Sequence, residues 1–382
     1  MVADLSEART RDRFAPAACP RLIVKIGSAL LVDEAGRVRR QWLAGVVADI
    51  AERHAQGQRI VVVSSGAIAL GARRLGLPKG GRSSLEDAQA AAATGQIALS
   101  QAWAALLGEQ GLIAAQMLVT LGDMEDRRRY LNAAATLDRL LALGVVPIIN
   151  ENDSVATTEI RFGDNDRLAA RIGQAANADG VLLLSDIDGL YTANPAHDPA
   201  ASFVPKVTRI DARILAMADA DSASGMGSGG MVSKLEAARI ANAGGSHLAI
   251  VSGRVERPLS AYAATGRGTV FVASKGHSAH KTWLAGRLTA KGRIHVDAGA
   301  ARALRDGRSL LPAGATRVEG GFARGDVVNI LDAEGRLIAR GLTEYDAADA
   351  GRIVGHRSGA LPAILGYAPR AALVHRNHLV ML

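Results

Sequence analysis

A glycine-rich stretch over residues 225–234, GMGSGGMVSK, ends in a lysine and overlaps the start of a segment with helical periodicity, Met231–Ala243. Glycine accepts positive φ and has no Cβ, so backbone N–H groups in such a loop can close around an anion. A helix N-terminus adds unpaired N–H groups and the positive end of the helix dipole. The pattern therefore predicts a phosphate-binding loop, with Lys234 in the first turn of the helix facing the phosphates.

Two established phosphate motifs do not describe this loop. The P-loop pattern G-x-x-x-x-G-K-[ST] fails because Met231, Val232 and Ser233 separate the last glycine from the lysine. The dinucleotide pattern G-x-G-x-x-G matches in letters, but the preceding residues 218–224 are polar and cannot form the buried strand that it needs. An ordinary surface loop stays the alternative interpretation.

Short apolar runs recur along the first two thirds of the chain. Because they are rich in Val, Ile and Leu without alternation, they are predicted to be strands covered on both faces. Segments with helical character at 42–50 and 86–107 lie between them, which makes a repeated β–α pattern and predicts a mostly parallel sheet. The apolar runs are 22–26, 60–63, 112–119, 145–149, 181–184 and 248–251.

Small and polar residues stand where these runs end. They are Lys25–Ser28, Ser64–Gly66, Asn150–Asp153 and Ser185–Asp186. In open α/β sheets, ligands bind outside the carboxyl ends of the strands, so these residues are expected to meet in one crevice.

The loop 161–166, RFGDND, is a second concentration of functional groups. Its last residue, Asp166, has an alternative interpretation as the N-cap of a helix. The loop as a whole offers a carboxylate, an amide and a glycine, which suits a ligand carrying both an ammonium and a carboxylate. That combination indicates an α-amino acid.

Composition narrows the class of protein. The 382 residues are 48% hydrophobic and 21% charged, and no apolar run reaches the roughly 18 residues of a membrane span. A single cysteine, Cys19, excludes internal disulfides and cysteine-rich zinc sites. We therefore expect a cytoplasmic protein that does not associate with membranes. Residues 1–20 lack the hydrophobic core of a signal peptide and are predicted to be a disordered tail.

The β–α rhythm stops near residue 275. Residues 276–291 are polar and are predicted to be a linker between the first domain, 21–275, and a small β-rich domain, 292–382. From residue 285 onward the chain has five more Lys and Arg than Asp and Glu. Such a module could contact nucleic-acid phosphates, and an ordinary basic surface explains the charge equally well.

Taken together, these residues resemble the glutamate 5-kinase branch of the amino acid kinase family, and residues 292–382 resemble its PUA module. The resemblance covers nearly everything from Leu22 onward. It implies a three-layer αβα sandwich around a largely parallel sheet. Its motifs are Val24–Ser28, Ser64–Ile68, Gln116–Leu118, Ile149–Asp153, Gly163–Asp166, Gly189–Thr192, Gly225–Lys234 and Ile364–Tyr367.

The resemblance also implies roles for individual residues. Asp166 would orient the lysines, so the catalytic set is Lys25, Lys234 and Asp166, and no residue is assigned as a metal ligand. Where threonine is common the chain has Ser185, which keeps the hydroxyl. Glutamate would contact Ser65, Gly66, Asp153 and Asn165. ATP would contact Lys25, Gly27, Ser185, Asp186, Ser228, Gly229, Gly230, Met231, Val232, Ser233 and Lys234.

The implied reaction is ATP- and Mg²⁺-dependent phosphorylation of the side-chain carboxylate of L-glutamate, the first step of proline biosynthesis. A carboxylate with an ordinary pKa near 4.3 is already ionised at pH 7, so no general base is needed. The family further implies inhibition by proline and assembly as a homo-oligomer, a dimer or tetramer. Two alternatives stay open: a kinase of the same fold acting on aspartate or acetylglutamate, and an RNA-binding regulator that uses the PUA module.

Overall fold

The computed structural model describes residues 10–155, 164–219, 230–273, 290–367 and 369–382. The chain divides into two compact units, which are considered separately. The larger consists of Met1–Glu125 and Ala133–Lys275, and the smaller consists of Asp126–Asn132 and Gly276–Leu382.

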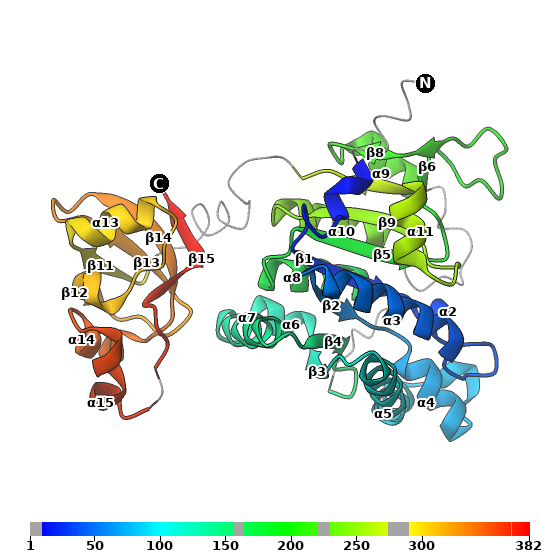
Figure 1. The fold of residues 1–382 in the computed structure, drawn as a ribbon, viewed down its shortest axis with the longest axis horizontal. Coiled ribbons are helices and arrows are strands. Elements are labelled where there is room, and N and C mark those ends of the chain that lie inside the picture. Colours follow the sequence, from blue (N-terminus) through cyan, green and yellow to red (C-terminus); the bar gives the residue numbers. More distant parts are fainter. Residues whose placement is uncertain (1–9, 156–163, 220–229, 274–289, 368) are drawn as a thin grey trace. The chain divides into compact units, whose positions relative to one another are not determined.

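An eight-stranded sheet forms the centre of the larger unit (Figure 1). Its strand order is β3-β4-β2-β1-β5-β9-β10-β8. The first six strands run parallel, and β10 is antiparallel to β9. The mostly parallel sheet predicted from the apolar runs is confirmed. The strands are β1 (Arg21–Ile26), β2 (Arg59–Val63), β3 (Ala114–Val119), β4 (Val146–Glu151), β5 (Gly180–Ser185), β8 (Lys206–Val207), β9 (His247–Ser252) and β10 (Gly268–Phe271), with β6 (Leu190–Tyr191) and β7 (Phe203–Val204) paired separately.

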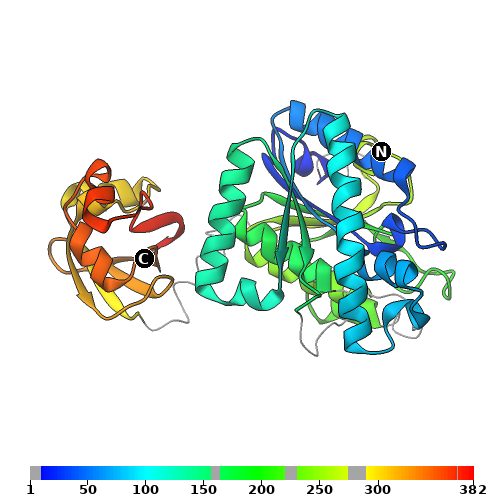
Figure 2. The same ribbon diagram turned by 90° about the horizontal axis from the view of Figure 1, so that it is seen from below.

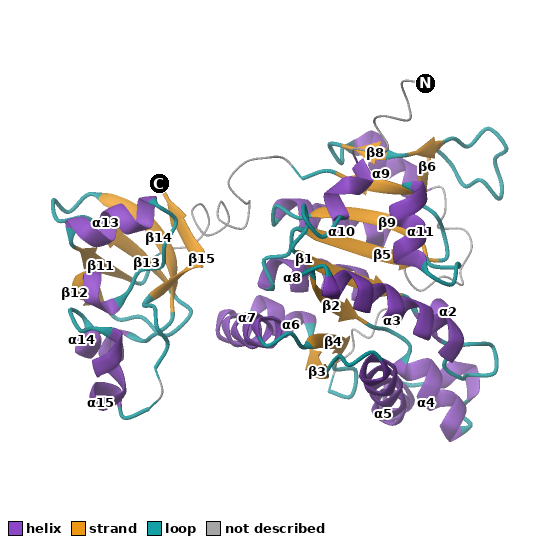
Figure 3. Cartoon of the chain, in the orientation of Figure 1, coloured by secondary structure: helices purple, strands orange, loops and turns teal. Residues whose placement is uncertain are grey.

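Helices separate most of the consecutive strands, as Figure 3 shows by colour. The predicted helix at Met231–Ala243 is confirmed with these bounds. The helices described from the start of the chain to β10 are α2 (Ser28–Leu31), α3 (Arg40–Ala55), α4 (Ala67–Leu75), α5 (Leu85–Glu109), α6 (Leu121–Glu125), α7 (Arg127–Ala142), α8 (Asp164–Ala175), α9 (Ala212–Asp219), α10 (Met231–Ala243) and α11 (Pro258–Thr265), with 3-10 turns η1 (Asp12–Phe14) and η2 (Pro78–Gly81).

The alternation of side chains along β1 assigns its residues to the two faces of the sheet. Leu22, Val24 and Ile26 belong to the apolar core that includes residues of α3, α5 and α11. On the other face, Ile23 approaches α8, where a Cβ added to Gly173 would lie 3.6 Å from it. Lys25 shares the face of Ile23, so the period of the strand directs its side chain toward α8.

Strand β3 departs from the prediction that every apolar run is covered on both faces. It lies at the edge of the sheet, and Leu118 is 38% exposed. An edge strand has a neighbour on one side only, and its apolar letters alone do not reveal that position.

Helices α4 and α5 approach each other unusually closely. A Cβ at Gly71 would lie 1.7 Å from the carbonyl oxygen of Ala91, and a Cβ at Gly95 would lie 1.8 Å from that of Ala67. Only glycine permits this separation, because any side chain would displace the opposite backbone. Figure 2 shows α5 as a long cyan helix beside the strands. The glycine contact therefore fixes the position of α5, whose other residues reach the candidate site described below.

The prediction of a disordered tail over residues 1–20 is wrong for its second half. Asp12–Phe14 forms a 3-10 turn, and Phe14 and Cys19 are buried in the core. The carbonyl oxygens of both residues accept hydrogen bonds from the Gln58 side chain. The charged residues around Phe14 led to the prediction of disorder, although the Phe14 side chain is part of the apolar core. Residues 1–9 lie outside the described part of the chain, and so does almost all of the predicted linker.

The smaller unit contains a five-stranded sheet with order β12-β11-β13-β14-β15. The β-rich prediction is confirmed, but the sequence reading missed its helices, since short helices carry few periods of apolar pattern. The elements are β11 (Gly292–Val296), α13 (Ala298–Arg305), η3 (Pro312–Gly314), β12 (Ala315–Gly320), β13 (Val327–Leu331), β14 (Leu337–Thr343), α14 (Ala347–Ile353), η4 (Ser358–Ala360), α15 (Leu361–Leu365) and β15 (Val374–Met381). Within the described residues of the whole chain, no helix has the length and apolar character to cross a bilayer.

Candidate active site

A buried carboxylate holds two lysines together at the carboxyl edge of the sheet. Lys25 Nζ lies 2.6 Å from Asp166 Oδ1, and Lys234 Nζ donates a hydrogen bond to Asp166 Oδ2 at 3.3 Å. The Asp166 side chain is fully buried, and those of Lys25 and Lys234 are 10% and 8% exposed. Burial by itself would raise the pKa of Asp166, but the two ammonium charges lower it overall. Two cations against one anion leave the cluster net positive, which suits an anionic ligand.

Three elements from distant parts of the chain supply this cluster. Lys25 is on β1, Asp166 is in the first turn of α8, and Lys234 is in the first turn of α10. The alternative interpretation of Asp166 as an N-cap is wrong, because α8 begins at Asp164. Asp166 is the third residue of this helix, and its carboxylate contacts both lysines.

The expected nucleotide residues flank the lysine cluster. A Cβ at Gly27 would lie 3.8 Å from Lys25 Nζ, so the chain passes close to this ammonium. Ser185 ends β5, next to β1, and its hydroxyl donates to Asp186 Oδ1 at 3.0 Å. Gly230 is the N-cap of α10, and because it has no side chain, no capping side chain covers the N-terminus of this helix.

The rest of the glycine-rich loop is described only in part. Met231, Val232 and Ser233 form the first turn of α10 together with Lys234. Ser228 and Gly229 lie outside the described residues, so their predicted contacts with ATP stay predictions.

The expected glutamate residues Ser65, Gly66 and Asn165 surround one short connection after β2. Asn165 Nδ2 donates to Ser65 Oγ at 2.7 Å and to the carbonyl oxygen of Ser64 at 3.3 Å. Gly66 has φ +101°, a conformation that residues with a Cβ rarely adopt, and it is the N-cap of α4. The glycine therefore permits the turn that presents Ser65 to Asn165.

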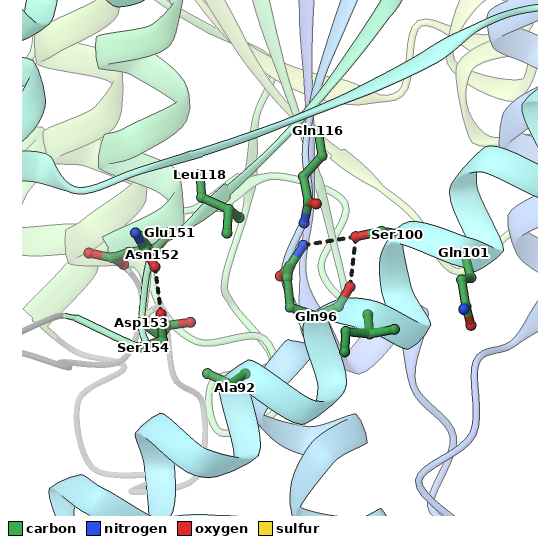
Figure 4. A pocket seen from close by; sticks show the side chains of 12 residues that line it. Ala92, Gln96, Ser100, Gln101, Gln116, Leu118, Glu151, Asn152, Asp153 and Ser154 are labelled. Carbon is green, nitrogen blue, oxygen red and sulfur yellow. Dashed lines mark hydrogen bonds between the residues drawn. The ribbon is translucent and has the colours of Figure 1, made fainter.

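Asp153 lines a pocket of about 440 Å³ beside α5, β3 and the end of β4 (Figure 4). Partial burial raises the pKa of Asp153 to about 6, and the Arg82 guanidinium opposes that rise. A carboxylate that has lost hydration stands to gain from a cationic ligand. The pocket is lined by Ala92, Ala93, Gln96, Ile97, Ser100, Gln101, Gln116, Leu118, Glu151, Asn152, Asp153 and Ser154.

Each of the two units matches a known family. Residues 20–252 match the amino acid kinase family, and residues 292–365 match the PUA domain. The chain belongs to the amino acid kinase family. It is 71% identical over 369 residues to a protein of Sphingopyxis alaskensis named glutamate 5-kinase, covering 97% of this chain and 99% of the relative. A protein of that name from Zymomonas mobilis is 61% identical over 393 residues, covering 100% of this chain and 99% of the relative.

The structure also connects Asn150, which was expected in the crevice as part of Asn150–Asp153, to residues that sequence reasoning did not assign a role. Asn150 is 2% exposed and connects the candidate substrate residues to α5, because its Nδ2 donates to Gln96 Oε1 at 2.6 Å. Gln96 and Ser100 are polar residues four positions apart on an alanine-rich helix, which is the signal that could have been noticed. Arg82, near Asp153, precedes that helix and carried no such signal.

Proposed function

We propose that this chain transfers the γ-phosphoryl group of ATP to the side-chain carboxylate of L-glutamate, giving L-glutamyl 5-phosphate and ADP as the first step of proline biosynthesis. The observation that carries the proposal is the Asp166 carboxylate held between Lys25 and Lys234. The names of the two relatives support glutamate as the acceptor.

In this proposal the lysine cluster receives the phosphates. Phosphoryl transfer needs two anions brought together and cations on the oxygens that gain charge. Asp166 neutralises one of its two lysine neighbours, so a positive charge is left for the phosphates of ATP. Mg²⁺ would arrive on those phosphates and keep several waters, and it would supply further neutralisation of charge.

The acceptor end of the site would hold the amino-acid head of glutamate. Asp153 would pair with the ammonium, while Ser65, the N–H groups after Gly66 and Asn165 would position the head. The distal carboxylate would then face the phosphates. A carboxylate oxygen attacks the γ-phosphorus as the bond to the ADP oxygen breaks, and no proton has to move, because the acceptor is ionised at pH 7.

Trapping with hydroxylamine tests the reaction directly, because an acyl phosphate converts to a stable hydroxamate. The full chain would be incubated with ATP and glutamate, aspartate or acetylglutamate, with and without Mg²⁺. Hydroxamate from glutamate alone, and only with Mg²⁺, is the expected result. Hydroxamate from aspartate or acetylglutamate in place of glutamate would instead indicate a kinase of the same fold with that acceptor.

Regulation and assembly belong to the same proposal. Inhibition by proline, a homo-oligomeric state, a cytoplasmic location and RNA binding by the PUA module stay predictions. Adding proline to the hydroxamate assay tests the first of these, and a salt-dependent RNA shift by the full chain tests the last.

A further inference from the structure

Asn165 has a buried oxygen without a hydrogen-bond partner. Its Oδ1 atom is buried and accepts no hydrogen bond within the described structure, although its Nδ2 atom donates toward three acceptors, Ser64 O, Ser65 Oγ and Asn150 Oδ1. A buried acceptor without a donor costs about 1–3 kcal/mol of stability. Such a cost is expected at a place that a ligand's donor will occupy.

Two backbone groups determine which way the amides at this site point. The carbonyl oxygen of Ser64 can only accept, so the Asn165 atom facing it is Nδ2. The backbone N–H of Glu151 can only donate, so the Asn150 atom facing it at 3.0 Å is Oδ1. With both amide orientations assigned, the buried atom that lacks a hydrogen-bond partner is Oδ1 of Asn165 and not its Nδ2.

Gln96 completes this arrangement from α5. Since Asn150 uses Oδ1 for the backbone and for Asn165 Nδ2 at 3.5 Å, its Nδ2 needs an acceptor. Gln96 Oε1 is that acceptor at 2.6 Å, and Gln96 Nε2 in turn donates to Ser100 Oγ at 3.4 Å. Figure 4 shows the Gln96–Ser100 contact on the wall of the pocket that Asp153 also lines.

We propose that Gln96 is a positioning residue for the acceptor substrate, acting through Asn150 to keep the Asn165 oxygen directed at the substrate ammonium. This inference rests on the proposed function and extends it. Without the Gln96 acceptor, the buried Nδ2 of Asn150 has no partner, and of its two ends only Oδ1 is still held, by the backbone N–H of Glu151. An amide held at one end can shift, and Asn165, which donates to this Oδ1, then loses one of the contacts that keep its own oxygen directed at the substrate ammonium.

Replacing Gln96 by Leu removes the acceptor at similar size, and Gln96→Glu keeps an acceptor. Glutamate KM is expected to rise roughly tenfold in Gln96→Leu, as for the loss of one hydrogen bond to a charged group, with kcat and ATP KM unchanged. Gln96→Glu is expected to stay within about threefold of the wild type, since a carboxylate oxygen also accepts from Asn150. Gln110→Leu, at the exposed C-terminal end of the same helix and not among the residues that line the pocket, is the matched control and should leave KM unchanged.

Glutarate separates positioning of the ammonium from general damage to the site, because it has both carboxylates of glutamate and no ammonium. Its inhibition constant is expected to be the same for the wild type and Gln96→Leu. An equal rise of this constant and of glutamate KM would overturn the inference. An unchanged glutamate KM in a folded Gln96→Leu variant would overturn it as well.

The wild type and an Asn165→Ala variant distinguish failure of the inference from failure of the proposed function. No hydroxamate from wild type with glutamate would overturn the proposed function and this inference with it. An active wild type whose KM rises in Asn165→Ala but not in Gln96→Leu would overturn the inference alone. If Gln96→Leu fails to fold, Gln96→Met removes the acceptor with a flexible side chain, and the same outcomes apply.

Discussion

The Nζ atom of Lys25 lies 2.6 Å from Oδ1 of Asp166. The two residues are far apart in sequence, and the first turn of α8 places Asp166 opposite the face of β1 that carries Lys25. Breaking a buried ion pair by removing one partner typically costs 3–5 kcal/mol, because the other charge is left uncompensated. The same ion pair therefore stabilises the larger unit and holds Lys25 in the position that the proposed reaction needs.

Replacing Asp166 by Asn removes the charge and keeps the shape. We expect kcat to fall about 100-fold, since the two ammonium groups would repel each other and lose their orientation. The free energy of unfolding is expected to fall by a few kcal/mol at pH 7. Hydroxamate formation and urea unfolding measure the two effects.

The pH dependence of the same variant checks the electrostatic explanation. The lysines lower the pKa of Asp166 against the opposing effect of burial, so its contribution to stability is complete above its ordinary value of 3.8 and is lost as the pH falls through the lower folded value. The stability difference between wild type and Asp166→Asn is thus expected to shrink in acid. A difference that stays constant down to pH 2 would contradict the ion pair as its source.

Lys234→Ala removes the second ammonium of the cluster. If the cation stabilises charge that develops during transfer, kcat is expected to fall by about 10²–10³-fold. Arg239→Ala is the control, because Arg239 is an exposed cation on the same helix. Wild-type turnover in Lys234→Ala would exclude the assigned role, and equal losses in both variants would indicate a general effect on α10.

The ionised Asp153 carboxylate is predicted to lower the stability of the folded protein while it provides a partner for the substrate ammonium. Its folded pKa, about 6, lies above the ordinary value of 3.8, so the folded state binds more protons than the unfolded state between these values, and stability falls as the pH rises through them. Asp153→Asn is therefore expected to be more stable than wild type at pH 8, by about 1–2 kcal/mol. This difference in stability is expected to shrink at pH 4, where the wild-type carboxyl group is protonated in the folded state. Thermal unfolding at both pH values measures this.

Binding by Asp153 should show the opposite preference. An ammonium prefers the ionised carboxylate, so glutamate KM of the wild type is expected to rise as the pH falls below about 6. In Asp153→Asn, KM should be raised at pH 8 and nearly independent of pH. A variant that keeps the wild-type KM and pH profile would remove Asp153 from the ammonium site.

Much of this architecture could be predicted from local pattern. Buried parallel strands are continuous apolar runs, and the helix at Met231–Ala243 begins after glycines and ends before them, so their bounds follow from the letters. Lys25 and Asp153 were predicted to belong to the site because they stand where such runs end. Phe14 was missed because its side chain packs against residues far along the chain, such as the Tyr262 ring at 5.9 Å, which no local window contains.

The parts of the site that local pattern could not supply depend on packing between distant elements. Asp166 resembles an N-cap until α8 is seen to begin two residues earlier. Gln96 gains its role only because α5 lies close enough to meet Asn150. That distance is determined by glycines in two helices, whose partners a single sequence does not identify.

The contact between α4 and α5 therefore leads to a prediction about both stability and binding. Gly95→Ala would place a methyl group 1.8 Å from the carbonyl oxygen of Ala67, so the helices must separate. We expect the free energy of unfolding to fall by about 2–4 kcal/mol and glutamate KM to rise, since Gln96 is the next residue and would move away from Asn150. Urea unfolding and hydroxamate kinetics measure the two effects.

Gly108→Ala is the matched control on the same helix. A Cβ at Gly108 meets nothing within 4 Å, so alanine is expected to stabilise the helix by about 0.5–1 kcal/mol through its higher helix propensity and to leave KM unchanged. If Gly95→Ala proved as harmless as Gly108→Ala, the close approach of α4 and α5 would not be what positions Gln96. A loss of stability with an unchanged KM would confine the role of Gly95 to packing.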